Sequence, residues 1–493
     1  MPARFVVDTL DAFERFGDRP ATTFRGGTLT FRRGLDSVHR IARALDGLGV
    51  GRGSGVVCVA GDRPEALFVR LAAYVLGARF TPVRSGLVDH VLAHIVHDAE
   101  PALVVSESEL PMIAAPLALS IDDLMDLAGA LSADPLPVRA RDEDIARITY
   151  TGGTTGRHKG AAGTYGALQA LRGSWWHEWD RTTPAGLTYL SVTWSGWLAL
   201  EYLYKGVRVE MLEEFSPEAL LDACARSAPV ATYLSPHMLY ALLDHPATSR
   251  GVPGLVSLGY GTSRTSPARL REAADRFGPI LRQGYGSIES GPVTVLSPED
   301  HTTALRSRPH LLGSVGRPRP GTAVDIQDPS GTSLPPGRVG EVNVRSTGMM
   351  AGYWRRPELT ARTLCNGWLR TGDLGYVDDD GYLYLVDRLN DVVTVNGHDC
   401  YSAPIEAALT RHPAVGQAAV VGRGSERTGE EIHAFLVPAA ASTAGDSVAA
   451  EALRLVVREL TPVHEPVAVH WIDRMPLTAA GKPDKNQLRA RLV

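Results

Sequence analysis

The strongest signal in the chain is the stretch Tyr150-Thr-Gly-Gly-Thr-Thr-Gly-Arg-His-Lys-Gly160. It contains four glycines, three threonines and Lys159, and it follows an apolar run, 145–150, that predicts a strand. Small residues let backbone N–H groups close on phosphate oxygens, while hydroxyls and a lysine add donors and positive charge. The spacing does not fit the Gly-x-x-x-x-Gly-Lys-Ser/Thr pattern of a P-loop. The stretch therefore predicts a phosphate-binding loop of another kind.

Composition places the chain among ordinary globular proteins. Of its 493 residues, 44% are hydrophobic and 21% are charged, and the formal net charge of −5 argues against a dedicated nucleic-acid or anionic-membrane binder. The first residues are too soon charged for a signal peptide, and Arg70 and Arg79 interrupt the most apolar stretch, 66–83. Four scattered cysteines fit neither a zinc cluster nor a disulfide framework. We therefore expect a cytoplasmic protein without a membrane or nucleic-acid partner.

Hydrophobic periodicity predicts an α/β fold. We expect helices over 35–48 and 64–76, and buried strands over 55–60 and 102–105. Alternation of strands and helices is typical of parallel sheets covered by helices, and it resumes over 187–281. The predicted fold class is a large N-terminal domain with parallel or mixed sheets flanked by helices.

The texture changes after about residue 310, where short strands alternate with Pro- and Gly-rich turns and predict a β-rich subdomain. An Asp-Gly pair between alternating runs predicts a hairpin over 377–385. We place a domain boundary so that residues 1–387 form the N-terminal domain and residues 388–493 form a small α+β domain.

In that small domain, Ser402 is expected to cap a helix whose first turn contains Pro404. A strand is expected over 415–422, and an amphipathic helix over 449–460.

Further motifs follow in a fixed order. They are Leu281-Arg-Gln-Gly-Tyr-Gly-Ser-Ile-Glu-Ser290, Gly348-Met-Met-Ala-Gly-Tyr-Trp354, Trp368-Leu-Arg-Thr-Gly-Asp-Leu374, Asp387-Arg-Leu-Asn-Asp-Val-Val393 and Pro476-Leu-Thr-Ala-Ala-Gly-Lys482. With the first stretch, they resemble the adenylate-forming superfamily, which contains acyl- and aryl-CoA synthetases, adenylation domains and luciferases. The resemblance spans roughly Ala21 to Arg491 and implies that the C-terminal domain is mobile and carries a catalytic lysine.

The resemblance implies a reaction in which a carboxylate attacks the α-phosphorus of ATP and gives an acyl-adenylate and pyrophosphate. Two anions must meet, so charge neutralisation and positioning dominate. The implied catalytic residues are Lys159, Glu289 and Lys482, and the implied Mg²⁺ ligands are Glu289 and Thr155. The residues implied to bind ATP or AMP are Thr151, Gly152, Gly153, Thr154, Thr155, Lys159, Gln283, Gly284, Tyr285, Gly286, Ile288, Asp373, Arg388 and Lys482.

Individual roles follow from the same resemblance. Tyr285 would stack on adenine, Asp373 would accept both ribose hydroxyls, and Arg388 would lie near that ribose. Lys482 would reach from the small domain to bridge the substrate carboxylate and the α-phosphate. Of the four lysines, Lys159 and Lys482 thus occupy positions that call for a compact point charge, while we interpret Lys205 and Lys485 as ordinary surface charge.

The sequence departs from the superfamily pattern at the nucleotide motif and at the hinge. Ile288 stands where a threonine hydroxyl is usual, so ATP turnover could be slower or differently arranged. Asn390 replaces the usual Asp or Lys of the hinge but still tolerates unusual backbone dihedrals. Thr394 replaces a lysine that some members use after rotation.

The acyl pocket is expected between two segments that follow strands. Residues 193–200 contain no Asp, which amino-acid-activating members use to pair an α-ammonium group, so we expect an acid without an α-amino group. The candidate pocket residues are Thr193, Trp194, Tyr260, Gly261, Gly286 and Gly291.

The acceptor of the acyl group is expected to be a thiol. The turn of Asn396, Gly397 and His398 lies where superfamily members contact pantetheine, which favours an AMP-forming acid–CoA ligase that uses ATP, Mg²⁺ and coenzyme A. A stand-alone adenylation enzyme that loads the phosphopantetheine of a carrier protein in trans is the main alternative. A degenerate member that binds nucleotide or acyl ligand without turnover is a third reading.

Overall fold

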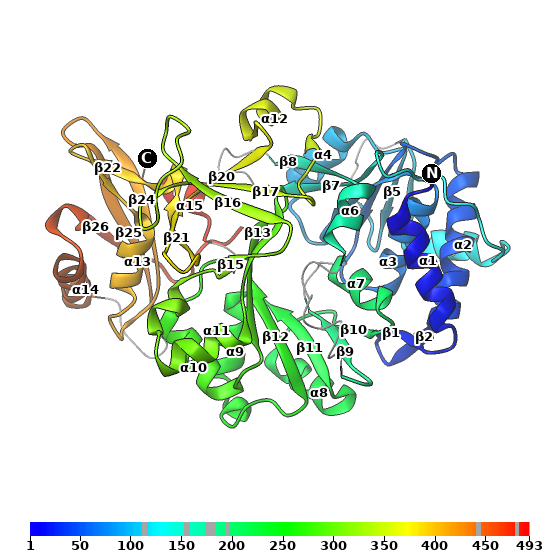
Figure 1. Cartoon of the computed structure of the whole chain (residues 1–493), viewed down its shortest axis with the longest axis horizontal. Helices are drawn as coiled ribbons and strands as arrows, with labels where there is room; N and C mark the ends of the chain where they lie inside the picture. Colours follow the sequence, from blue (N-terminus) through cyan, green and yellow to red (C-terminus); the bar gives the residue numbers. More distant parts are fainter. Residues whose placement is uncertain are drawn as a thin grey trace.

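The structure is a computed structural model of the chain (Figure 1). Its strands form four sheets within the described residues, of which three, including that of the β-rich subdomain, lie within residues 20–388 and one lies in the C-terminal part. The described residues are 1–110, 116–151, 158–172, 184–192, 197–439, 445–478 and 483–492.

The first N-terminal sheet carries the phosphate-loop stretch. Its strand order is β18-β8-β7-β4-β3-β5-β6, with parallel pairing among β3, β4 and β5 and antiparallel pairing of β7 with β8. The predicted strands over 55–60, 102–105 and 145–150 are confirmed to within one residue at each end. The strands are β3 (Gly55–Val59), β4 (Arg79–Val83), β5 (Leu103–Ser106), β6 (Ala118–Ser120), β7 (Ile145–Thr151), β8 (Lys159–Thr164) and β18 (Gly352–Tyr353).

The second N-terminal sheet carries the nucleotide motif. Its order is β15-β14-β13-β12-β11-β9-β10-β1-β2, and its central strands run parallel. The strands are β1 (Pro20–Phe24), β2 (Gly27–Thr30), β9 (Thr188–Ser191), β10 (Arg208–Met211), β11 (Val230–Leu234), β12 (Leu255–Gly261), β13 (Leu281–Ser287), β14 (Gly291–Leu296) and β15 (Arg317–Pro318).

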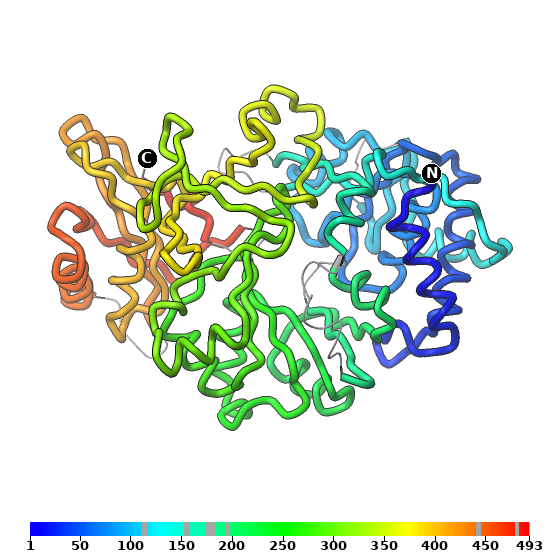
Figure 2. The backbone as a smooth tube through the Cα atoms, in the orientation of Figure 1, coloured from blue at the N-terminus to red at the C-terminus, as the bar shows by residue number. Residues whose placement is uncertain are grey.

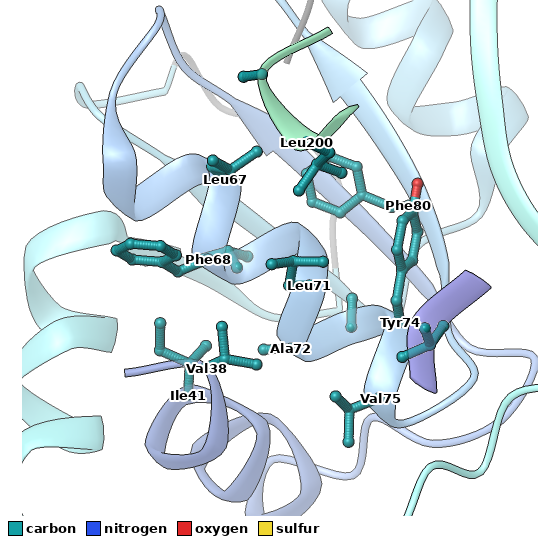
Figure 3. Close-up of a cluster of buried hydrophobic side chains, with 14 of the residues drawn as sticks. Val38, Ile41, Leu67, Phe68, Leu71, Ala72, Tyr74, Val75, Phe80 and Leu200 are labelled. Atoms are coloured by element: carbon teal, nitrogen blue, oxygen red, sulfur yellow. The ribbon is translucent and has the colours of Figure 1, made fainter. Parts of the chain in front are cut away.

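Helices cover both sheets, as the alternation predicts. The predicted helices over 35–48 and 64–76 are present, and Pro64 occupies the first turn of the second one. Figure 3 shows how Phe68 and Leu71 of that helix pack in one apolar cluster with Val38 and Leu200. The helices are α1 (Arg4–Phe16), α2 (Phe31–Gly47), α3 (Pro64–Val75), α4 (Asp89–Ala99), α5 (Ile121–Gly129), α6 (Tyr165–Leu171), α7 (Trp197–Tyr204), α8 (Pro217–Ser227), α9 (Pro236–Asp244), α10 (Pro267–Phe277) and α11 (Pro298–Arg306).

The predicted β-rich subdomain forms the third sheet, in the order β16-β17-β20-β19, with β21 paired to β20. The predicted hairpin is confirmed, because β20 and β21 pair around a turn at Gly381, whose φ is 82°. The elements are β16 (Thr322–Gln327), β17 (Gly340–Ser346), α12 (Pro357–Thr363), β19 (Leu364–Cys365), β20 (Trp368–Val377) and β21 (Leu383–Arg388).

The C-terminal part is a separate small α+β unit that packs beside this third sheet (Figure 2). Its sheet has the order β23-β22-β25-β24, with β26 beside β25. The elements are η3 (Leu389–Asp391), β22 (Val393–Val395), β23 (His398–Cys400), α13 (Ser402–Leu409), β24 (Val415–Ser425), β25 (Gly429–Pro438), α14 (Asp446–Glu459), β26 (Ala468–Trp471) and α15 (Lys485–Ala490).

The cap predicted for α13 is wrong. Ser402 is the first helical residue, and its side chain makes no cap. Instead, the Asp387 carboxylate accepts hydrogen bonds from the backbone N–H groups of Ser402 and Ala403. A carboxylate from β21 thus satisfies free donors at the helix start.

Two predictions from the sequence concern membrane-spanning helices and the state of the cysteines. No described helix is both long and apolar enough to cross a membrane. The four cysteines lie within these ranges and are free thiols.

Gly261 fixes the approach of β12 to its neighbours and gives a stability test. A Cβ at this position would lie 2.2 Å from the Tyr233 hydroxyl and 2.6 Å from the Gly284 carbonyl oxygen. We expect Gly261→Ala to lower the free energy of unfolding by about 2 kcal/mol in denaturant titrations, because the strands must move apart. Gly47→Ala is the control, since a Cβ there meets open space. Equal stability of the two variants would contradict this packing.

Candidate active site

The phosphate-loop stretch connects two paired strands. Thr151 at the end of β7 lies directly opposite Lys159 at the start of β8. Gly152, Gly153, Thr154 and Thr155 fall outside the described residues, so their roles stay predictions. The Oγ1 atom of Thr151 is buried without a hydrogen-bond partner among the described residues. A buried hydroxyl at the base of the loop is free to bond to an added group such as a phosphate oxygen.

Tyr353 links the two charged residues predicted for catalysis in this part of the chain. The Lys159 Nζ donates to the Tyr353 hydroxyl over 2.5 Å, and that hydroxyl donates to Glu289 Oε1 over 2.9 Å. The ammonium and the carboxylate are themselves 3.7 Å apart. Burial lowers the pKa of Lys159, and the Glu289 charge opposes that shift. The structure therefore brings a cation, a hydroxyl and a carboxylate together at the start of β8.

Tyr353 is a site residue that the sequence analysis missed. It stands in the motif over 348–354, but its neighbours in the site are 194 and 64 residues away along the chain. The contact arises because the short strand β18 pairs with β8, with Tyr353 opposite Ala161. The motif over 348–354 was the sequence feature that pointed to Tyr353, because it contains a single tyrosine, directly after a glycine.

Tyr285, Asp373 and Arg388 form a second cluster. Asp373 and Arg388 face each other across the β20–β21 pair, and Arg388 Nε lies 2.6 Å from Asp373 Oδ1. The Tyr285 hydroxyl donates to the other carboxylate oxygen over 2.7 Å. Burial and the Asp373 charge raise the pKa of Tyr285 well above its usual range, so the hydroxyl stays protonated. Asp373 is only 8% exposed, and both of its oxygens have partners in this structure.

The other predicted nucleotide residues belong to β13 and the turn after it. Gln283 and Gly284 lie in β13, and Gly286 approaches Gly291 so closely that a Cβ would lie 2.2 Å from its carbonyl oxygen. Ile288 packs against the apolar core of the β-rich subdomain, which explains how an aliphatic side chain is accommodated there. The Glu289 carbonyl accepts from Met350 N over 2.8 Å and fixes the turn.

The candidate acyl pocket is described in part. Thr193 and Trp194 lie outside the described residues. Tyr260 is fully buried, and its hydroxyl bonds to Gln283 and to His301 Nε2 at 2.8 Å. Gly261, which follows it in β12, is buried as well, so a role of either residue in an acyl pocket stays a prediction.

Only some of the site residues predicted in the C-terminal part lie within the described ranges. Lys482 lies outside the described residues. Asn396 and Gly397 form the tight turn between β22 and β23, with φ values of 51° and 78°, and His398 follows it exposed. The interpretation of Lys485 as surface charge is wrong, because its Nζ lies 2.8 Å from Glu406 and only 17% of its side chain is exposed.

The two clusters differ in the chemistry they can support. The first offers a lysine, a carboxylate and the buried Thr151 hydroxyl, which suit a polyphosphate with a divalent cation. Among the described side chains, no three of His, Cys, Asp and Glu gather closely enough to hold a metal alone. A single carboxylate such as that of Glu289 is the kind of protein ligand that suits Mg²⁺ beside substrate phosphates. The second cluster offers a carboxylate and an aromatic ring, which suit a nucleoside.

Known proteins are similar to this chain over most of their length. A medium/long-chain-fatty-acid–CoA ligase of Mycobacterium tuberculosis is 33% identical over 97% of this chain and 88% of its own. A fatty acid–[acyl-carrier-protein] ligase of Streptomyces coeruleorubidus is 31% identical over 96% of this chain and 93% of its own. The solved structure of an amide bond synthetase from Marinactinospora thermotolerans is 33% identical, covers 100% of both chains and has a TM-score of 0.85.

Family profiles match both parts of the chain. The AMP-binding enzyme profile matches residues 10–354, and the AMP-binding enzyme C-terminal domain profile matches residues 404–482. These matches confirm the resemblance to adenylate-forming enzymes and the α/β fold with a large N-terminal and a small C-terminal domain. The chain belongs to the AMP-binding enzyme family.

Proposed function

We propose that this enzyme activates a carboxylic acid with ATP and transfers the acyl group from the acyl-adenylate to the thiol of coenzyme A. The observation that carries the proposal is a pair of clusters close to each other, since the charge of Asp373, and with it that of Glu289 from the first cluster, raises the pKa of Arg388 in the second. The triphosphate and a divalent cation fit Lys159, Glu289 and Thr151, while the nucleoside fits Tyr285 and Asp373. The AMP-binding family match and the acid–thiol ligase relatives support the same reaction.

In this mechanism, Lys159 holds the β- and γ-phosphates, and its hydrogen bond to Tyr353 keeps the ammonium directed at them. Glu289 would hold Mg²⁺, with Thr155 as a second ligand, and the cation would neutralise charge on the phosphates. Asp373 exchanges the Tyr285 hydroxyl for the ribose hydroxyls, while Arg388 keeps the carboxylate in place. Lys482 then brings positive charge to the substrate carboxylate and the α-phosphate as they meet.

The two half-reactions are assigned to two orientations of the small domain. We propose that residues 1–387 form the adenylation domain and that residues 388–493 rotate after pyrophosphate leaves. Rotation would replace Lys482 by the turn at Asn396, Gly397 and His398, which would contact the pantetheine of the acceptor. β21 ends at Arg388, so the pivot is best placed in the next residues, Leu389 and Asn390. The free thiols of the chain fit a reducing compartment such as the cytoplasm.

The acceptor has alternatives with specific support. The Streptomyces relative is named for loading an acyl carrier protein, and the Marinactinospora enzyme is named for forming amide bonds. Both would share the first half-reaction and differ in whether a carrier thiol or an amine attacks the acyl-adenylate. We place coenzyme A first because the Mycobacterium relative is named a CoA ligase and matches over 97% of this chain.

The function is tested by pyrophosphate release over a panel of aryl, short, medium and long acids, each assayed without acceptor, with coenzyme A, with a holo carrier protein and with a primary amine. We expect release that depends on one class of acid without an α-amino group, and a thioester with coenzyme A. Tight ATP binding with no acid-dependent release would instead indicate a member without turnover.

Lys482→Arg tests the assigned catalytic lysine. Because a planar guanidinium does not replace a compact ammonium that must fit between two anions, we expect this variant to lose most acid-dependent pyrophosphate release. Its rate of thioester formation from a chemically prepared acyl-adenylate should stay close to that of the wild type. Adenylation at the wild-type rate would exclude the assigned role.

Tyr353→Phe tests the residue between Lys159 and Glu289. Without the hydroxyl, the two charges, which lie 3.7 Å apart, can approach each other more closely and compete with phosphate and cation. We expect KM for Mg²⁺–ATP to rise about tenfold, as loss of a hydrogen bond to a charged group usually costs about 1.4 kcal/mol.

Tyr165→Phe is the matched control for that variant. It removes another buried hydroxyl, which donates to Ala78 O over 2.7 Å away from the site. This control should lose stability and keep the wild-type KM. An unchanged KM in Tyr353→Phe would contradict the role given to the hydroxyl.

A further inference from the structure

The last helix of the chain contacts the segment that connects the two domains. Arg489 in α15 donates to Asp391 Oδ1 over 2.7 Å and to the Asn390 carbonyl oxygen over 3.3 Å. Lys485, one turn earlier in α15, has its Nζ 4.0 Å from the other Asp391 oxygen. Two cations of one short helix therefore hold the carboxylate at the end of the connecting segment, about 95 residues earlier in the chain.

Lys485 also connects this contact to the rest of the small domain. Its Nζ donates to Ser402 Oγ over 2.6 Å and lies 2.8 Å from Glu406 Oε1, both in α13. Glu406 Oε1 in turn accepts from Val420 N of β24 over 2.9 Å. One ammonium thus joins α15, α13 and the connecting segment, and through Glu406 it reaches the sheet.

The charge of Lys485 is stabilised where it lies. Burial by itself lowers its pKa, but the carboxylates of Glu406, Asp391 and Asp387 outweigh burial and raise the pKa above its usual value. The side chain is therefore a charged, multiply bonded lysine inside the domain, where an unpaired ammonium would be costly. Replacing it with a neutral side chain leaves carboxylates without their partner.

The residues on either side of 479–482 pair with each other directly before α15. Leu477 and Pro483 form a β-bridge, and Asp484 N donates to the Pro476 carbonyl oxygen over 2.8 Å. Met475 and Leu488 on either side of this pairing are buried in one apolar cluster. The residues before and after 479–482 are thus held together, directly next to Lys485.

We propose that Lys485 is a positioning residue that ties the residues flanking Lys482, 475–478 and 483–484, to the connecting segment through Asp391 and Glu406, so that these flanking residues rotate with the small domain as one body. The proposal rests on the proposed function for the role of Lys482. Lys485 itself touches no reacting group. Figure 1 shows α15 in the small C-terminal part, where it packs against β24.

Hydrogen exchange in the full-length protein tests the connection without requiring activity. In Lys485→Met, we expect exchange to become about tenfold faster both in 389–392, where Asp391 loses its contact with Lys485, and in 475–484, because α15, which follows this segment directly, loses its anchor on Glu406. Arg411→Met is the control, since it breaks an exposed ion pair with Glu459 in the same domain. Faster exchange confined to α15, with residues 389–392 unchanged, would overturn the proposal.

Kinetics separate positioning from a general loss of stability. We expect Lys485→Met to lower kcat for acid-dependent pyrophosphate release about tenfold with KM for ATP nearly unchanged, because a displaced lysine loses rate more than ground-state binding. Thioester formation from prepared acyl-adenylate should be less affected, and Lys485→Arg, which keeps the charge, should recover most of the rate.

Two kinetic results would overturn the positioning role of Lys485. One is a wild-type kcat in Lys485→Met, and the other is a loss of activity that only follows the unfolded fraction and affects both half-reactions equally. If the wild type itself releases no pyrophosphate with any acid, the proposed function fails, and the exchange experiment still decides whether Lys485 joins the two segments.

Discussion

The connecting segment between the two domains is held at each end by an ion pair with a carboxylate. Before it, Arg388 is paired with the buried Asp373 across two neighbouring strands. After it, Asp391 is paired with Arg489 of the last helix. Leu389 and Asn390 lie between these two fixed points. Asp373 is also the proposed ribose ligand. The same carboxylate would therefore serve nucleotide binding and hold the N-terminal end of the connecting segment, which would link nucleotide binding to the position of the hinge.

The proposed ATP site already contains most of its charges in place. Tyr353 separates Lys159 from Glu289, and Tyr285 occupies one oxygen of Asp373. These tyrosines stay protonated because burial and the adjacent carboxylate raise the pKa of each phenol. Each neutral hydroxyl can therefore give up its hydrogen bond to a charged side chain when the nucleotide binds, and the tyrosine is not left as an unpaired charge. Preorganisation of this kind lowers the rearrangement needed when ATP binds.

The sequence predicted the elements and the order of the motifs better than it predicted contacts. The helix over 64–76 and the strand over 145–150 follow local periodicity, and the structure contains both. Tyr353 was missed because its contact with Lys159 depends on strand pairing 194 residues away. Lys485 was misread for the same reason, since its carboxylate partners are brought to it by the fold. The cap of α13 likewise comes from Asp387 and not from the local serine.

The central claim is that a carboxylate of the substrate attacks the α-phosphorus of ATP in this site. Isotope transfer tests it most directly: the enzyme is given an accepted acid labelled with ¹⁸O in its carboxyl group, together with ATP and coenzyme A, and the AMP is analysed by mass spectrometry. Attack by the carboxylate places one ¹⁸O in each AMP formed. Unlabelled AMP, or ADP as the nucleotide product, would contradict the account.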